Sequence, residues 1–285
     1  GGYRLGNRIF KCLGRHGAMD MRSAIMKSCN TYFYAMANRV GYDAIAPVAR
    51  QLGLGQEFPL PFQSQRYGTI PDSVWKKKKY DQEWSRSDSL NAVIGQGYVI
   101  TSPFQLAVMA SRIASGRMLE PEILLKNRRA GPHLPFPDEH LQVVRDGMDL
   151  VVNGAGTAVR SRLDLPDVKM AGKTGTAQVR AIRGGQRGQG GARRYRDHGL
   201  FICFAPTVQP RYAAAVVIEH GMGGARAAAP VAKDVLTFLY DREKAMASLE
   251  ALEAGWGGGI EERMALQYAA FQAGQGVPAS ERSEM

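Results

Sequence analysis

The chain has 285 residues, of which 45% are hydrophobic and 22% charged, so it has enough apolar residues for a sizeable globular core. The formal net charge of +11 favours anionic partners such as nucleic acid, acidic lipid or an acidic polymer, without choosing among them. No run approaches the ~20 apolar residues of a membrane span. The three cysteines, Cys12, Cys29 and Cys203, have neither the even number of a disulfide scaffold nor metal-ligand spacing.

The first half of the chain has the pattern of a helical region. Asp20 can cap a short helix, and in the next stretch apolar residues repeat every three to four positions until Gly41. Ser102 followed by Pro103 marks the start of a later helix. Residues 56–90, rich in Pro, Gly, Ser and charge, are expected to form a long surface excursion. The predicted helices span residues 21–27, 31–40, 42–52, 103–115 and 138–152.

The second half of the chain predicts strands followed by a helix. Apolar, partly β-branched runs predict strands over residues 168–179, 199–205 and 212–219, and a helix over 229–241 follows them. Helices first, then antiparallel strands, then a helix against the sheet is an α+β arrangement rather than a series of βαβ units. We therefore expect an α+β fold, with an antiparallel sheet flanked by helices.

The chain is expected to divide into one domain over residues 1–241 and a tail over residues 242–285. The tail has a helical pattern to about Leu252, breaks at residues 255–259 and resumes over residues 261–273. Its polar end is expected to be disordered.

A Lys-Thr-Gly-Thr run lies inside a predicted strand; alone it is a weak signal, and it gains weight from the second motif described below. Lys173, with the hydroxyls of Thr174 and Thr176, offers charge-assisted hydrogen-bond donors for a carboxylate. Gly175 has no side chain, so an extended peptide can pack against this strand as an added strand. The run therefore predicts a site for the carboxylate end of a peptide.

A Ser-x-Asn motif lies between two predicted helices. Ser28 can pass a proton between a lysine and a leaving nitrogen, and the amide of Asn30 can hold a substrate backbone or the lysine. Alone, Ser28 is as well explained as a helix cap. Together with the Lys-Thr-Gly run, Ser28 and Asn30 match the motif set of serine acyl-transfer enzymes.

Further segments resemble a known family. They are 94–97 (Ile-Gly-Gln-Gly), 101–107 (Thr-Ser-Pro-Phe-Gln-Leu-Ala), 171–178 (Ala-Gly-Lys-Thr-Gly-Thr-Ala-Gln), 197–201, 204–206 and 219–221. With the segment around Ser28, they make the chain up to about Asp241 similar to class B penicillin-binding proteins. The likeness is greatest to the elongation-specific type, penicillin-binding protein 2, whose transpeptidase fold is then the expected one.

The resemblance implies a peptidoglycan D,D-transpeptidase that cross-links stem peptides through an acyl-serine intermediate and is blocked by β-lactams. It implies Ser28, Asn30 and Lys173 as catalytic residues, the residues 174–176 as substrate-binding, and no cofactor or metal. It also implies an inner-membrane anchor and a periplasmic domain. The implied partners are stem peptides ending in D-Ala-D-Ala, β-lactams, a SEDS-family glycan polymerase and cell-shape scaffold proteins. No aromatic platform accompanies the basic runs, so nucleic acid is not an expected partner.

One part of the family pattern is missing from this sequence. The first family motif, Ser-x-x-Lys, supplies the acylated serine and precedes Ser28, but residues 1–27 do not contain it. The match at Ser73-Val74-Trp75-Lys76 follows Ser28 and lies in a lysine-rich, loop-like stretch, a context that argues against it. We therefore expect the chain to be the C-terminal portion of the domain, with the nucleophile outside it, and the isolated chain to be inactive.

Several alternatives stay open at this point. The same motifs fit a D,D-carboxypeptidase or a penicillin-sensing relative, and a missing nucleophile fits a non-catalytic scaffold. Cys29 with His16 is a weaker candidate nucleophile, since small cysteines between helices usually fill the core. Gln96 either lines a cleft or shapes a turn. The basic segment 184–191 is a hypothetical contact with anionic glycan or lipid head groups.

Overall fold

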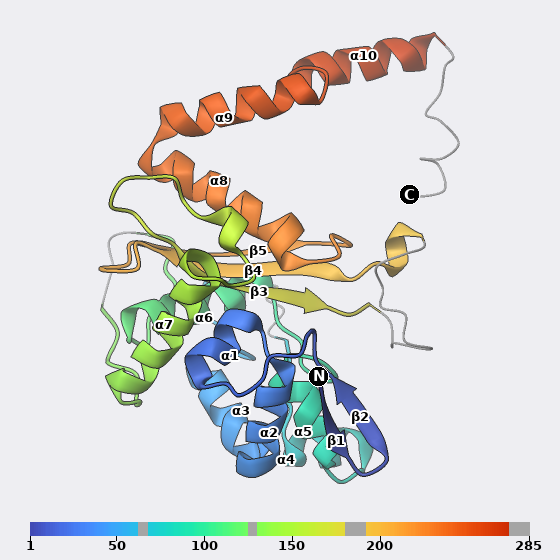
Figure 1. Cartoon of the computed structure of the whole chain (residues 1–285), viewed down its shortest axis with the longest axis vertical. Helices are drawn as coiled ribbons and strands as arrows, with labels where there is room; N and C mark the ends of the chain where they lie inside the picture. The colour runs from blue at the N-terminus through green and yellow to red at the C-terminus, as the bar shows by residue number, and fades with distance from the viewer. Residues whose placement is uncertain (62–67, 125–129, 180–191, 274–285) are drawn as a thin grey trace.

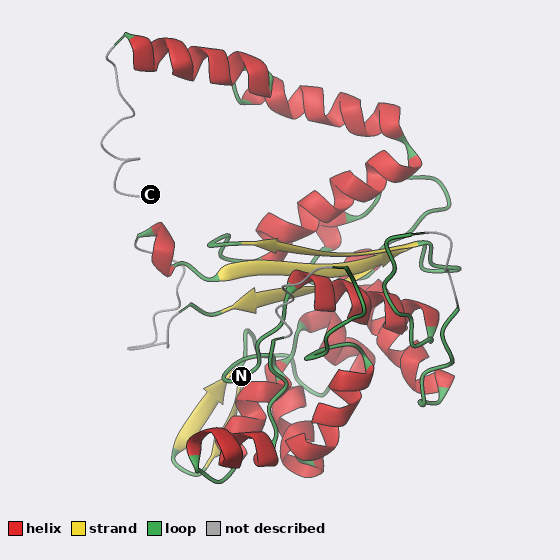
Figure 2. Ribbon diagram, turned by 180° about the vertical axis from the view of Figure 1, so that it is seen from behind, coloured by secondary structure: helices red, strands yellow, loops and turns green. Residues whose placement is uncertain are grey.

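A three-stranded antiparallel sheet between two layers of helices forms the centre of the protein (Figure 1, Figure 2). The computed structural model describes residues 1–61, 68–124, 130–179 and 192–273. The sheet consists of β3 (Ala171–Ala177), β4 (His198–Ala205) and β5 (Tyr212–Ile218), in that order in space. Among the described residues, β3 is therefore an edge strand.

The helices lie in two groups, one on each side of this sheet (Figure 1). Below it in Figure 1 are α1 (Met21–Lys27), α2 (Asn30–Val40), α3 (Tyr42–Gln51), α4 (Ser73–Tyr80), α5 (Arg86–Val93), α6 (Pro103–Ser115) and α7 (Asp138–Asn153), together with the hairpin of β1 (Gly2–Leu5) and β2 (Arg8–Lys11). On the other side are α8 (Ala229–Tyr240), α9 (Arg242–Gly255) and α10 (Ile260–Gln272). The expected α+β arrangement is confirmed.

The main core lies where α6, α7 and α8 pack against the sheet. Phe201 and Phe204 of β4 are fully buried there, in one cluster with Met148 and Val151 of α7 and Leu236 of α8. Burying large apolar side chains on the central strand is the main favourable contribution to such a fold. Because every residue of β3 is paired with β4, this core also fixes the position of β3.

Most helix limits follow from capping signals in the sequence. The carboxylate of Asp20 accepts a backbone N–H bond at the start of α1, and the hydroxyl of Ser102 does the same for α6, directly before Pro103. Gly116, with φ 70°, ends α6 in the left-handed conformation that glycine adopts easily. For these reasons the predicted helices and the three predicted strands agree with the observed ones to within a few residues.

Two parts of the N-terminal half differ from expectation. The predicted surface excursion over residues 56–90 contains α4 and most of α5, and Leu90 is fully buried in it. The lysine run in α4 was interpreted as a solvated loop, and the helix was therefore missed. In the structure Asp72 caps this helix, and Lys76 is buried against Asp88. The β1–β2 hairpin was not predicted either, since each of its strands has only four residues and no long apolar run.

The C-terminal helices α9 and α10 project away from the sheet (Figure 1). No residue in either helix is buried, and Trp256 and Phe271 are 54% and 71% exposed. In the described part of the chain, every helix is too short or too polar to cross a membrane. The division into a domain over 1–241 and a tail over 242–285 stays a prediction. The expected disordered end, after residue 273, lies outside the described residues.

Candidate active site

A tight turn between α1 and α2 presents Ser28 to the edge of the sheet. Ser28 has φ 53° and ψ 49°, and its N–H bonds to the carbonyls of Ala24 and Ile25 close α1. The left-handed conformation costs about 1–2 kcal/mol for residues other than glycine, and such strained residues are concentrated at functional sites. The turn holds the Ser28 hydroxyl in one place, two residues ahead of Asn30.

Lys173 of β3 meets Ser28 at this turn. Its Nζ donates one hydrogen bond to Oγ of Ser28 and another, of 2.9 Å, to the carbonyl of Thr174. Burial lowers the pKa of Lys173 to about 8, because the ammonium loses water. Within the described residues, no carboxylate compensates this charge, so the ammonium contacts only neutral oxygens of the protein. The structure thus brings the two predicted motifs together, although they are 145 residues apart.

The two threonines of the Lys-Thr-Gly-Thr run have different surroundings. Oγ1 of Thr174 lies 2.7 Å from Oγ1 of Thr157, which follows α7, whereas Thr176 is exposed. Thr157 was not found by sequence analysis; a lone threonine after a glycine-rich break carries no distinctive signal. Gly175 lies between the threonines on the edge strand, and a Cβ there would lie 3.3 Å from Cβ of Leu200. The predicted binding of a carboxylate and of an added strand stays a prediction.

Asn30 is the first residue of α2 and follows Ser28 by two residues. In the part of the chain that the structure describes, its side-chain amide has no hydrogen-bonding partner. An unpaired amide that is only partly exposed is available for a ligand, since such groups are normally satisfied. This position is compatible with the predicted role of Asn30 in holding a substrate backbone, which stays a prediction.

Gln96 connects the helical layer to β3. Its side-chain Nε2 donates a 2.9 Å hydrogen bond to the carbonyl of Thr176. Gly95 and Gly97 on either side have φ 74° and 72°, so the residues form a tight turn that only glycine makes without strain. Gln96 is therefore part of a turn, and its side chain reaches the strand of the Lys-Thr-Gly run; that it lines a cleft stays a prediction.

The out-of-context Ser-x-x-Lys match lies elsewhere. Ser73 begins α4, and its N–H donates to a carboxylate oxygen of Asp43. Nζ of Lys76 lies 2.7 Å from Oδ2 of Asp88, and this hydrogen bond raises the pKa of Lys76. In Figure 1, α4 lies at the far end of the helical layer from β3. Ser73 is thus separated from the Ser28–Lys173 contact, and Lys76 keeps its proton.

Three soft donor atoms lie beside the Ser28 turn, and sequence spacing did not reveal them. The Sγ atoms of Cys12 and Cys29 and a ring nitrogen of His16 lie within 4.8 Å of one another. The Sγ of Cys12 is 3.6 Å from Nδ1 of His16, close to the ~3.5 Å between sulfur and nitrogen ligands of a tetrahedral zinc ion. Two thiolates and an imidazole suit Zn²⁺, so these residues could hold such an ion.

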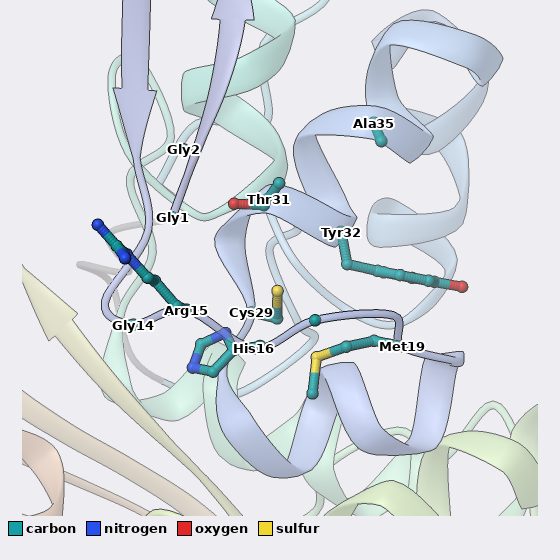
Figure 3. Close-up of a pocket in the computed structure, with 11 residues that line it drawn as sticks. Gly1, Gly2, Gly14, Arg15, His16, Met19, Cys29, Thr31, Tyr32 and Ala35 are labelled. Carbon is teal, nitrogen blue, oxygen red and sulfur yellow. The ribbon is translucent and has the colours of Figure 1, made fainter.

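The surroundings of these donors favour ionisation of Cys12. Burial acts to raise its pKa, but backbone hydrogen bonds from the loop after β2 and from the start of α2, with the Thr31 hydroxyl, outweigh burial and lower the pKa to about 6. Burial raises the pKa of Cys29, which argues against Cys29 as a nucleophile. His16 and Cys29 line a pocket of about 370 Å³ that leaves room for a further ligand (Figure 3).

The comparison with protein families gives one assignment for most of the chain. The model described as "Penicillin binding protein transpeptidase domain" matches residues 6–237. The chain is also 35% identical to the peptidoglycan D,D-transpeptidase MrdA of Acinetobacter baumannii, over 80% of this chain and 36% of that protein. The chain therefore spans little more than a third of that relative's length.

Solved structures of two penicillin-binding proteins have a similar fold. The complex between PBP2 and MreC from Helicobacter pylori matches with a TM-score of 0.73 and 27% identity, over 85% of this chain and 44% of the other. PBP2 of Pseudomonas aeruginosa in complex with WCK 5153 matches with a TM-score of 0.69 and 32% identity, over 83% and 52%.

Proposed function

The chain belongs to the penicillin-binding protein transpeptidase domain family, as a homologue of the PBP2/MrdA type, and on this premise we propose that it forms one wall of the active site of a peptidoglycan D,D-transpeptidase. The observation that carries the proposal is the contact between Lys173 and Ser28. It joins a cation on an edge strand to a hydroxyl on a helical turn. An acyl-transfer site needs these groups around one nucleophile.

In the proposed reaction, a serine hydroxyl attacks the carbonyl of the penultimate D-Ala of a stem peptide. The serine loses its proton, the bond from this carbonyl to the terminal nitrogen breaks, and the nitrogen leaves as free D-Ala after it gains a proton. The amine of a second stem peptide then attacks the acyl-serine ester. A new amide forms, and the serine leaves with its proton restored.

We assign roles to the residues of this wall accordingly. The ammonium of Lys173 and the hydroxyls of Thr174 and Thr176 receive the carboxylate of the terminal D-Ala. Ser28, which accepts a hydrogen bond from Lys173, passes the proton toward the leaving nitrogen. The amide of Asn30 holds the substrate backbone.

The proposal places the acylated serine in a Ser-x-x-Lys segment outside residues 1–285. Ser73 does not suit this role, because Lys76 is paired with Asp88 and keeps its proton. The isolated chain is then inactive toward penicillin. We refer below to the polypeptide that combines this segment with residues 1–285 as the complete protein.

The proposed setting is cell-wall elongation, with the complete protein anchored in the inner membrane and this chain in the periplasm. A cell-shape scaffold protein is a proposed partner, which the H. pylori complex of PBP2 with MreC supports. A SEDS-family glycan polymerase is a second proposed partner, since cross-linking acts on newly made glycan strands.

Fluorescent penicillin tests this proposal. The complete protein should form a covalent fluorescent adduct, and a peptide ending in D-Ala-D-Ala should slow the labelling. Lys173→Ala should lower the labelling rate about 10²–10⁴-fold. Lys169→Ala, an exposed lysine just before β3, is the matched control and should label normally.

The products distinguish the alternatives. Dimeric cross-linked peptide supports a transpeptidase, whereas release of D-Ala without a dimer supports a D,D-carboxypeptidase. Absence of any adduct, with the protein folded, favours a non-catalytic scaffold. Labelling of Lys173→Ala at the rate of the unaltered protein would contradict the assigned site.

A further inference from the structure

Two side chains, one from β3 itself and one from the turn after α5, donate hydrogen bonds to backbone carbonyls of β3. Nζ of Lys173 donates to the carbonyl of Thr174, and Nε2 of Gln96 donates to the carbonyl of Thr176. Residues two apart in a strand direct their carbonyls to the same side. In the described part of the chain, β4 pairs with β3 on one side only, so these carbonyls mark the open edge. Gln96 thus covers one of the acceptors that an added strand requires.

Gln96 is presented from a well-fixed turn. Its N–H donates to the carbonyl of Asn91 at 3.0 Å, and Gly95 N–H donates to the carbonyl of Ala92 at 2.9 Å. Tyr98, two residues further on, packs against Trp75 with ring centroids 5.4 Å apart. Because the backbone is held on both sides, the side chain of Gln96 can leave Thr176 by rotation without opening the turn.

We propose that Gln96 competes with the substrate: its amide occupies the Thr176 carbonyl in the free protein and is displaced by a backbone-type N–H of the bound stem peptide or β-lactam. This inference rests on the proposed function and adds a residue that selects among ligands. A ligand with an amide N–H at this point replaces the bond it breaks. A ligand without one either leaves the carbonyl unpaired or leaves Gln96 in place.

The competition has a predictable size. A neutral hydrogen bond in a partly exposed site contributes modestly, so its removal should speed binding of an amide-bearing ligand about two- to tenfold. Protection of the free edge is the corresponding benefit, since an uncovered edge strand invites pairing with other chains. Gln96 is therefore a positioning residue that tunes access to β3 and takes no part in bond making.

The test compares two kinds of penam on the complete protein. One carries an acylamino side chain, whose N–H can replace Gln96; the other lacks this group. Gln96→Met keeps the side-chain length but removes the donor. It should raise the acylation rate constant for the acylamino penam about two- to tenfold and leave the second penam within twofold. Gln178→Met, an exposed glutamine two residues beyond Thr176, is the matched control and should change neither.

Other outcomes overturn the inference. If Gln96→Met slows acylation by both penams equally, Gln96 is a structural tether; if neither rate changes, it does not compete. Should Gln96→Met not fold, the NMR signal of the Gln96 side-chain NH₂ in the unaltered protein decides, because it must shift when an acylamino penam binds. Failure of the proposed function is recognised separately, since neither penam would then acylate the unaltered protein.

Discussion

Lys76 of α4 and Lys173 of β3 both have side chains within the protein, but their ammonium groups meet different partners. Lys76 lies 2.7 Å from the carboxylate of Asp88, which raises its pKa. Lys173 donates to a hydroxyl and a carbonyl, and burial lowers its pKa to about 8. Lys76 also belongs to a Ser-x-x-Lys match and Lys173 to a Lys-Thr-Gly match, but only the Lys-Thr-Gly match has the order and context of the family.

The difference lies in whether the protein itself neutralises the charge. Asp88 belongs to the capping box of α5, so the Lys76–Asp88 pair ties α4 to the start of α5 and neutralises the ammonium within the protein. The ammonium of Lys173 has no counter-ion among the described residues, which is costly unless an anion arrives. A half-buried cation that has no counter-ion among the described residues and contacts a strained serine indicates a ligand site.

The largest expected effect comes from breaking the internal pair. Lys76→Met should lower the free energy of unfolding by about 1–3 kcal/mol, because it leaves the half-buried Asp88 carboxylate with its Ser85 hydrogen bonds but without a cation. Lys173→Met should not lower it, since no carboxylate loses a partner. Urea unfolding of both variants measures this, and Lys76→Met/Asp88→Asn should recover part of the loss. Equal destabilisation by Lys76→Met and Lys173→Met would contradict the claim that only Lys76 is paired with a carboxylate of the protein.

Zinc binding beside Ser28 should give the next largest effect. The lowered pKa of Cys12 favours the thiolate, which is the form that binds Zn²⁺. Zinc at a hundred times its dissociation constant should stabilise the fold by about 2.7 kcal/mol. Thermal unfolding with and without Zn²⁺ measures this, and Cys12→Ser should abolish the gain, whereas Cys203→Ser, distant in β4, should retain it. If Zn²⁺ still raises the unfolding temperature of Cys12→Ser, zinc does not bind at the Cys12–His16–Cys29 cluster.

Acylation by penicillin should depend on pH in a way that separates the two lysines. The ammonium of Lys173 is present below its pKa of about 8 and is lost above it. The acylation rate should therefore fall about tenfold per pH unit above pH 8, because the carboxylate loses its cation. Lys76 keeps its raised pKa, so its ion pair persists over the same range and the fold is unchanged. Lys173→Arg should flatten the profile; an unaltered profile in that variant would point to another titrating group.

A smaller effect is expected where a neutral group supports the Lys-Thr-Gly strand. Thr157→Val removes the partner of the Thr174 hydroxyl and should weaken penicillin binding about two- to tenfold, with the later acylation step unchanged. Thr157→Ser keeps the hydroxyl and should restore affinity. Stopped-flow kinetics with penicillin measures the dissociation constant and the acylation rate constant separately. A loss confined to the acylation rate constant would contradict a role of Thr157 in supporting the binding strand.

Much of this fold could be predicted because its signals are local. Asp20, Ser102 and Pro103 mark helix starts in any context, and the apolar runs of β4 and β5 identify a buried sheet. The resemblance of the Lys-Thr-Gly strand and the Ser28 turn to a known family predicted that these two segments form one candidate site, and the structure brings them into contact. Helix α4 was missed because its stability depends on Asp88, twelve residues after Lys76, and not on its own composition.

The contacts around the site could not be predicted, because they depend on packing between distant segments. Gln96 reaches Thr176 only when the turn after α5 lies against β3. Cys12, His16 and Cys29 approach one another only when the loop after β2 folds onto the Ser28 turn. The segment 184–191, for which an anionic contact was hypothesised, lies outside the described residues.

A crystal structure of the complete protein acylated by an acylamino penam tests the central claim most directly. We predict that the penam carboxylate lies within hydrogen-bonding distance of the hydroxyls of Thr174 and Thr176 and near Nζ of Lys173, with Ser28 Oγ beside the acylated serine. A penam carboxylate bound away from β3, or an adduct on Ser73, would contradict the account.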